Sequence, residues 1–86
     1  MYAPEEALKA RLFPGIAFRG DDDDRRAYLI ETNLDVWHVI GRYKDADESF
    51  DRAVAETELT GRELRTALSY YERFPREIDE SIALDR

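Results

Sequence analysis

The chain has 86 residues, a net charge of −7 and no cysteine. We therefore expect one small domain without a disulfide framework, a thiolate metal site or a cysteine nucleophile. No apolar run approaches the ~20 residues that a membrane-spanning helix needs, and the start of the chain lacks the pattern of a signal peptide. These features predict a cytoplasmic protein that does not bind membranes.

A short helix followed by a β-hairpin is predicted for residues 1–31. Pro4 and the two glutamates after it suit the first turn of a helix over 4–12, with Ala7, Leu8, Arg11 and Leu12 as a weak one-sided pattern. The segments 16–19 and 26–30 then alternate apolar and polar residues, as strands do. Two strands alone are marginal in water, so we expect this hairpin to lean on helices or on a partner.

The connection between the two predicted strands contains four aspartates in a row, Asp21–Asp24. Calcium-binding loops space their oxygen ligands and add a distant bidentate glutamate, and this run lacks that spacing. We interpret it as a solvated loop flanked by Arg19, Arg25 and Arg26. The sequence therefore predicts no metal site here.

The residues that an enzyme would need do not form a recognisable pattern. The single histidine, His38, follows Trp37 within a helical pattern, and we interpret it as a surface or half-packed residue. There is no Gly-rich phosphate loop and no ordered Ser/His/Asp set. We expect no enzymatic activity, no cofactor and no small-molecule substrate.

Three helices are predicted over residues 34–74. The first begins at Asp35 or just before it, with Thr32 or Asn33 as its N-cap. The second runs from about Asp47 to Glu56. The third follows Thr60-Gly61-Arg62-Glu63, which matches a capping box. The apolar residues expected on the inner faces are Leu34, Val36, Trp37, Val39, Ile40, Tyr43, Phe50, Ala53, Val54, Leu64, Ala67, Leu68 and Tyr71.

A last helix is predicted from Pro75 through Arg86, with Ile78, Ile82 and Leu84 facing inward. The expected organisation is one helix-turn-helix domain over 1–86, with a helix and hairpin at 1–31, a tri-helical unit at 34–74 and a C-terminal helix at 75–86. The fold class is mainly α, with a tri-helical unit, a short N-terminal β-hairpin and flanking helices, and the family resemblance below implies that the unit is homeodomain-like or winged-helix-like.

The third helix of the tri-helical unit carries a local excess of basic residues in an acidic chain. Residues 60–76 contain four arginines and two glutamates. In helix-turn-helix proteins, the N-terminal residues of this helix enter the major groove of DNA. The candidate DNA-binding residues are therefore Thr60, Gly61, Arg62, Arg65, Thr66 and Ser69. The alternative is that these arginines are ordinary solvated residues on an amphipathic helix.

The stretch "LTGRELRTALSYYERFPREIDESI" resembles the C-terminal signature of the domain of unknown function four-three-three (DUF433) family. That signature has a Leu-Thr start, an Ala-Leu-x-Tyr-Tyr core and a Pro-x-Glu-Ile-Asp end. They correspond here to 59–60, 67–71 and 75–79. Upstream, "RRAYLIETNLDVWHVI" resembles the region that leads into the first helix of the unit, so the resemblance covers about residues 25–82.

The resemblance implies a homeodomain-like helix-turn-helix and a grouping with VapB-type antitoxins. Such antitoxins bind operator DNA for autoregulation and cover a PIN-like ribonuclease toxin, and we expect a homodimer. The family commonly has Gly-Thr-Arg where this chain has Glu31-Thr32-Asn33, which removes a flexible turn position and a potential phosphate contact. Together with the charge of −7, this leaves a second hypothesis open. In it, the same fold is a protein-interaction or dimerisation module that does not bind DNA.

Overall fold

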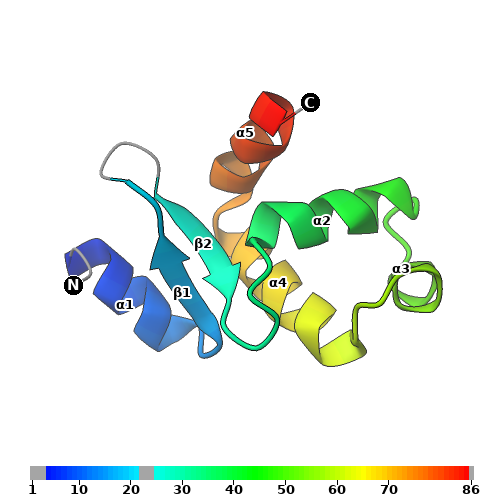
Figure 1. Ribbon diagram of the computed structural model, residues 1–86, viewed down its shortest axis with the longest axis horizontal. Coiled ribbons are helices and arrows are strands. Elements are labelled where there is room, and N and C mark those ends of the chain that lie inside the picture. Colours follow the sequence, from blue (N-terminus) through cyan, green and yellow to red (C-terminus); the bar gives the residue numbers. More distant parts are fainter. Residues whose placement is uncertain (1–3, 22–24, 86) are drawn as a thin grey trace.

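The computed structural model describes residues 4–21 and 25–85, and over these ranges it is mainly helical with a small antiparallel sheet, as expected (Figure 1). Arg86 and most of the Asp21–Asp24 run lie outside the described residues. Within them, no helix is long and apolar enough to cross a membrane. The elements are α1 (Pro4–Leu12), β1 (Ile16–Arg19), β2 (Arg26–Leu29), α2 (Val36–Asp45), α3 (Phe50–Glu56), α4 (Gly61–Arg73) and α5 (Pro75–Asp85).

The hairpin formed by β1 and β2 buries one face against the helices. Ile16 lies opposite Leu29 and Phe18 opposite Ala27, and all four side chains are buried. The backbone N–H of Ile30 donates to the carbonyl of Gly15 at 2.9 Å, which extends the pairing by one residue. A two-stranded sheet is marginal alone, and here α1 packs along β1 while α2 and α4 contact β2.

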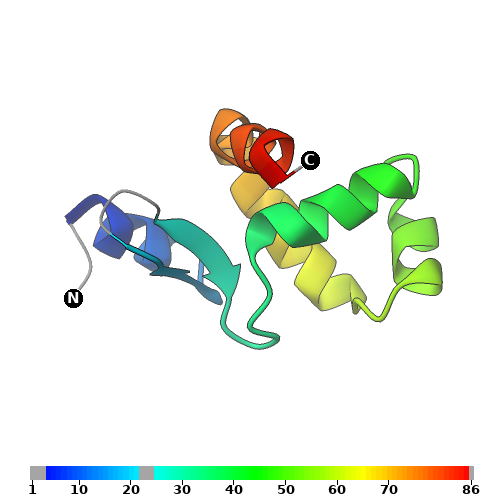
Figure 2. The same cartoon turned by 45° about the horizontal axis from the view of Figure 1, so that its top comes forward.

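The helices α2, α4 and α5 pack against one another beside the hairpin (Figures 1 and 2). The short α3 joins the C-terminal end of α2 to the N-terminal end of α4, on the side away from α1. One continuous hydrophobic core runs through the hairpin and the helices that pack beside it. Its buried members are Ile16, Phe18, Ala27, Leu29, Val36, Val39, Ile40, Ala46, Ala53, Leu59, Leu64, Ala67, Tyr70 and Ile78.

Tyr70 of α4 is fully buried where α1, β1 and α5 meet. Its ring lies 5.4 Å from that of Phe13, 6.2 Å from that of Phe18 and 5.0 Å from that of Phe74, between centroids. Its hydroxyl donates to Oε2 of Glu77 at 2.5 Å. Burial, followed by the hydrogen bond to Glu77, raises the pKa of the Tyr70 hydroxyl well above its usual value.

Two predicted helix starts were wrong, each for a local reason. The N-cap of α2 is Asp35, not Thr32 or Asn33, because Asn33 takes a left-handed conformation with φ of 64° and turns the chain before the helix begins. The predicted start of the second helix at Asp47 is also wrong. Asp47 and Glu48 have positive φ, and α3 begins only at Phe50, where the side chain of Ser49 accepts the backbone N–H of Arg52.

Some predicted inward positions were also wrong. Leu84 is 89% exposed, whereas Ile78 is buried and Ile82 half-buried as predicted. Leu8 and Leu12 of α1 are both 55% exposed, because α1 faces the body with Lys9, Ala10 and the following Phe13 instead. On α4, Tyr71 is half-buried against the core as predicted, but the fully buried tyrosine is Tyr70, which the sequence pattern did not single out.

Leu64 and Leu84 provide a matched test of the core. The side chain of Leu64 is 0% exposed and that of Leu84 89% exposed. We expect Leu64→Ala to lower the free energy of unfolding by about 2–5 kcal/mol through lost burial and a residual cavity. Leu84→Ala should change it by less than about 0.5 kcal/mol. Urea unfolding followed by circular dichroism measures both, and equal effects would contradict this packing.

The raised pKa of Tyr70 predicts a loss of stability at alkaline pH. The neutral hydroxyl is favoured in the folded state, so its contribution is fully present below the ordinary tyrosine pKa of about 10 and declines as pH rises above it. The free energy of unfolding should fall by up to about 1.4 kcal/mol per pH unit there from this group. Urea unfolding between about pH 8 and 11 should show a shallower decline for Tyr70→Phe than for Tyr43→Phe. Identical pH profiles of the two variants would refute the assignment.

Candidate functional site

The N-terminal turn of α4 is fixed by its cap. The side-chain oxygen of Thr60 accepts the backbone N–H of Glu63 at 3.1 Å, which is the threonine half of the predicted capping box. The first intrahelical bond follows, from the N–H of Leu64 to the carbonyl of Thr60 at 3.1 Å. The cap therefore sets where the helix begins and which way its first side chains project.

Gly61 lies where α3 approaches α4. A Cβ atom at this position would lie 3.4 Å from Cζ of Phe50 and 3.3 Å from Nη1 of Arg65. The Arg65 guanidinium in turn lies over the Phe50 ring, 5.9 Å from its centroid. The structure thus gives the predicted site residue Gly61 a packing role, since it lets the start of α4 come close to α3.

One face of α4 is polar and exposed along the whole helix. Arg62, Arg65, Ser69 and Arg73 share this face by helical spacing and are all exposed, and we call them the arginine face. The opposite side is buried through Leu64 and other residues of the core. Of the six predicted site residues, the structure therefore brings Arg62, Arg65 and Ser69 together on one open surface.

The two remaining hydroxyl-bearing candidates donate within their own helix. Thr66, which is half-buried, donates to the carbonyl of Arg62 at 3.0 Å, and Ser69 donates to the carbonyl of Thr66 at 2.7 Å. Their oxygens remain acceptors, but their protons are already used. Direct contacts to an anion from this face would therefore come chiefly from Arg62, Arg65 and Arg73.

Acidic groups surround the start of the arginine face. Arg62 borders a small pocket on the side of the hairpin, and the same pocket has glutamates on its wall. Its lining residues are Pro14, Gly15, Leu29, Glu31, Arg62, Glu63 and Thr66. The negative charge of Glu31 and Glu63 reduces the positive potential at Arg62.

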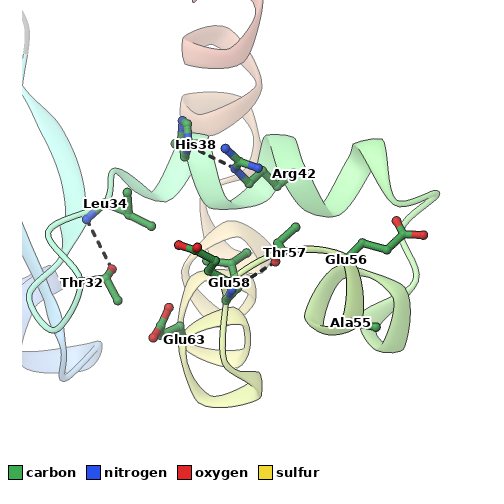
Figure 3. Close-up of a pocket in the computed structure, with 10 residues that line it drawn as sticks. Thr32, Leu34, His38, Arg42, Ala55, Glu56, Thr57, Glu58 and Glu63 are labelled. Carbon is green, nitrogen blue, oxygen red and sulfur yellow. Dashed lines mark hydrogen bonds between the residues drawn. The ribbon is translucent and has the colours of Figure 1, made fainter.

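A larger open groove lies between α2 and the connection from α3 to α4 (Figure 3). We call it the glutamate groove. It encloses about 800 Å³. It is lined by Thr32, Leu34, His38, Arg42, Ala55, Glu56, Thr57, Glu58, Leu59 and Glu63.

Charges of opposite sign lie on opposite walls of the glutamate groove. On α2, Nε of Arg42 donates to Nε2 of His38 at 3.3 Å (Figure 3). On the other wall, Glu56 is paired with Arg52, with Nε to Oε1 at 3.2 Å. The carboxylates of Glu58 and Glu63 have no hydrogen bond or ion pair with any residue that the structure describes. The connection is held by Thr57, whose side-chain oxygen accepts the N–H of Leu59 at 3.2 Å.

The loop before α2 is anchored by a cluster that the sequence patterns did not predict. Asp35 accepts hydrogen bonds from Arg19, with Nη2 to Oδ1 at 2.7 Å, and from Nε1 of Trp37 at 3.0 Å. Arg19 also donates to the side chain and the carbonyl of Asn33, at 2.7 and 2.9 Å, and stacks over Tyr28 at 4.4 Å. The partners lie 14 and 16 residues apart in sequence, too far for a helix or turn pattern to indicate.

The anchored loop links both hollows to the hairpin. Glu31 lines the small pocket, while Thr32 and Leu34 line the glutamate groove. Elsewhere in residues 4–21 and 25–85, no group of three or more His, Asp or Glu side chains is arranged to hold a metal ion. Through its bonds to Asn33 and Asp35, Arg19 holds the loop that borders both hollows beside α4.

Comparisons with family models, with curated proteins and with solved structures gave no significant match. The resemblance to the family of unknown function therefore rests on the residues quoted for it above.

Proposed function

We propose that this chain is an antitoxin-like DNA-binding protein of a toxin–antitoxin pair, with α2, α3 and α4 as its helix-turn-helix. In this proposal α4 enters the major groove of operator DNA, and a separate surface binds and neutralises a PIN-like ribonuclease toxin. The observation that carries the proposal is the arginine face, an exposed basic surface on the helix that follows a short connection from α3. The fold and partners of this proposal are those that the family resemblance implies.

The chemistry of the arginine face suits a nucleic acid. Arg62 and Arg65 belong to the first turns of α4, where the helix dipole favours a phosphate. A guanidinium can also bond two acceptors on a guanine edge. The buried side of the helix, with Leu64 and Ala67 at 0% exposure, gives these arginines a rigid base. A homodimer would present two such helices to a two-fold symmetric operator.

The DNA half of the proposal is tested with the region upstream of the chain's own gene. We expect salt-sensitive binding at micromolar protein or tighter, measured by fluorescence anisotropy. Arg62→Ala with Arg65→Ala should weaken binding about tenfold or more and lower the slope against log salt by about 2, since each lost phosphate contact removes about 0.9.

The control for this test is Arg11→Ala with Arg42→Ala, an equal loss of charge on α1 and α2. We expect it to leave most of the affinity and the salt slope in place. If the parent chain shows no salt-sensitive binding, or if both double variants behave alike, α4 is not the DNA-contacting helix.

The second candidate function is a protein-interaction or dimerisation module of the same fold that does not bind DNA. The observation that favours it is the acidic surrounding of α4, where Glu31 and Glu63 share a pocket with Arg62 and Glu58 lies on the adjacent connection. If α4 entered the major groove, the DNA phosphates would lie near these carboxylates as well as near the arginines, and the carboxylates would repel them.

The two candidates predict opposite behaviour of the same variant in cells. If the chain acts only through a protein partner, Arg62→Ala with Arg65→Ala will protect cells from the neighbouring toxin as well as the parent does, and repression of its promoter will not depend on the chain. A promoter–reporter assay beside a toxicity assay separates the outcomes. Loss of repression with protection preserved would support DNA binding and contradict the second candidate.

A further inference from the structure

The glutamate groove has the composition of a site for a positively charged segment of a protein. Leu34 and the buried Leu59 supply apolar lining, and the carboxylates of Glu58 and Glu63 stand beside them on one wall. Figure 3 shows Glu58 above Glu63, with both carboxylates directed toward the side of Thr32. An apolar lining next to carboxylates is what an arginine or lysine side chain needs, since its stem is hydrocarbon and its head is charged.

The charged groups around the groove that no neighbour neutralises decide which sign of charge a ligand should carry. Glu56 is already bound to Arg52, and Arg42, which is hydrogen-bonded to His38 on the same helix, keeps its positive charge on the opposite wall. The side chains of Glu58 and Glu63 make no hydrogen bond or ion pair within residues 4–21 and 25–85. The carboxylates of Glu58 and Glu63 outnumber the guanidinium of Arg42, so the net charge of these three groups is negative, and it would repel a nucleic-acid phosphate and attract a cation.

The size and shape of the groove favour a peptide segment over an isolated ion. About 800 Å³ is many times the volume of one bound cation and is comparable with a pocket for several side chains. The lining comes from the loop before α2, from α2 itself, from the connection after α3 and from α4. Arg19 and Thr57 hold the two loops in place, so the groove does not have to be formed on binding.

We propose that the glutamate groove binds an arginine- or lysine-bearing segment of a protein partner, with Glu58 and Glu63 receiving its cationic groups and Leu34 and Leu59 contacting its aliphatic stems. The inference rests on the partner-binding half of the proposed function, and it assigns that half a surface and a chemistry. It places the partner surface beside the arginine face and not on it, because Glu63 lines the groove and also borders the small pocket of Arg62, while Arg65 lies on the exposed side of the same helix.

The probe for this site is a blocked heptapeptide of alanine and leucine that carries two arginines. Its control is the same peptide with citrulline, which keeps the shape of arginine and removes its charge. Titration of the ¹⁵N-labelled full chain to about millimolar peptide, followed by NMR, should shift the amide signals of Thr32, Leu34, Glu58 and Leu59 with the arginine peptide. The citrulline peptide should shift them much less.

The variant for this site is Glu58→Gln with Glu63→Gln, and its matched control is Glu72→Gln with Glu80→Gln. Both remove the same charge, and the control glutamates are exposed on α4 and α5 outside the groove. The first variant should weaken the arginine peptide about fivefold or more, and the control less than about twofold. Circular dichroism checks that both remain folded.

Three results would overturn the site. They are equal weakening by both double variants, equal binding of the arginine and citrulline peptides, and signal shifts confined to residues outside the groove. Arg62→Ala with Arg65→Ala removes positive charge near Glu63 and should not weaken peptide binding, so a chain that fails to bind DNA can still bind the peptide. Failure of this inference is in that way distinguishable from failure of the DNA half of the proposed function.

Discussion

The structure depends on the burial of Tyr70, which lies between the N-terminal helix and hairpin on one side and the start of α5 on the other. Phe13 and Phe18 reach this side chain from the N-terminal part, and Phe74 reaches it from the turn before α5. The hydroxyl does not interrupt the apolar contacts, because it donates to Glu77, which Lys9 of α1 also contacts at 3.2 Å. A chain of this length buries only a modest core. One aromatic side chain that contacts both the N-terminal residues and Phe74 therefore contributes a large share of the buried apolar surface.

Around that core, the two sides of α4 carry charges of opposite sign. The arginine face is open, while Glu63 belongs to the groove that α2 closes on the other side. A single helix thereby presents a basic surface and an acidic one, within a chain whose net charge is −7. The overall acidity therefore says little about what the arginine face can bind, because screening limits each surface to its near surroundings.

The Arg19–Asp35 cluster connects the hairpin to these surfaces. Asn33 adopts φ of 64°, and its carbonyl and side chain both accept from Arg19. The tripeptide 31–33 departs from the pattern of the family that the sequence resembles. It still forms a defined turn here, since asparagine tolerates the left-handed conformation better than most residues. Glu31 and Thr32 are held at the borders of the two hollows beside α4 as a result.

Local patterns in the sequence were sufficient for most of the elements and for part of the site. The bounds of α1, the two strands and the start of α4 follow from proline, alternation and the Thr60 cap, which act over a few residues. The exposure of Arg62, Arg65 and Ser69 follows likewise from helical spacing.

What local patterns could not supply depends on residues distant in sequence. Helical spacing favoured Tyr71, yet Tyr70 is the buried residue, because Phe13 and Phe18 fill the space beside it. Leu84, near the end of α5, suited an inward pattern and is 89% exposed. The sequence by itself determined where most helices and strands lie and which helix carries the arginines. Only the tertiary structure decided which faces are buried and that Leu34, Glu58 and Glu63 share one groove, because those facts depend on how separate elements pack.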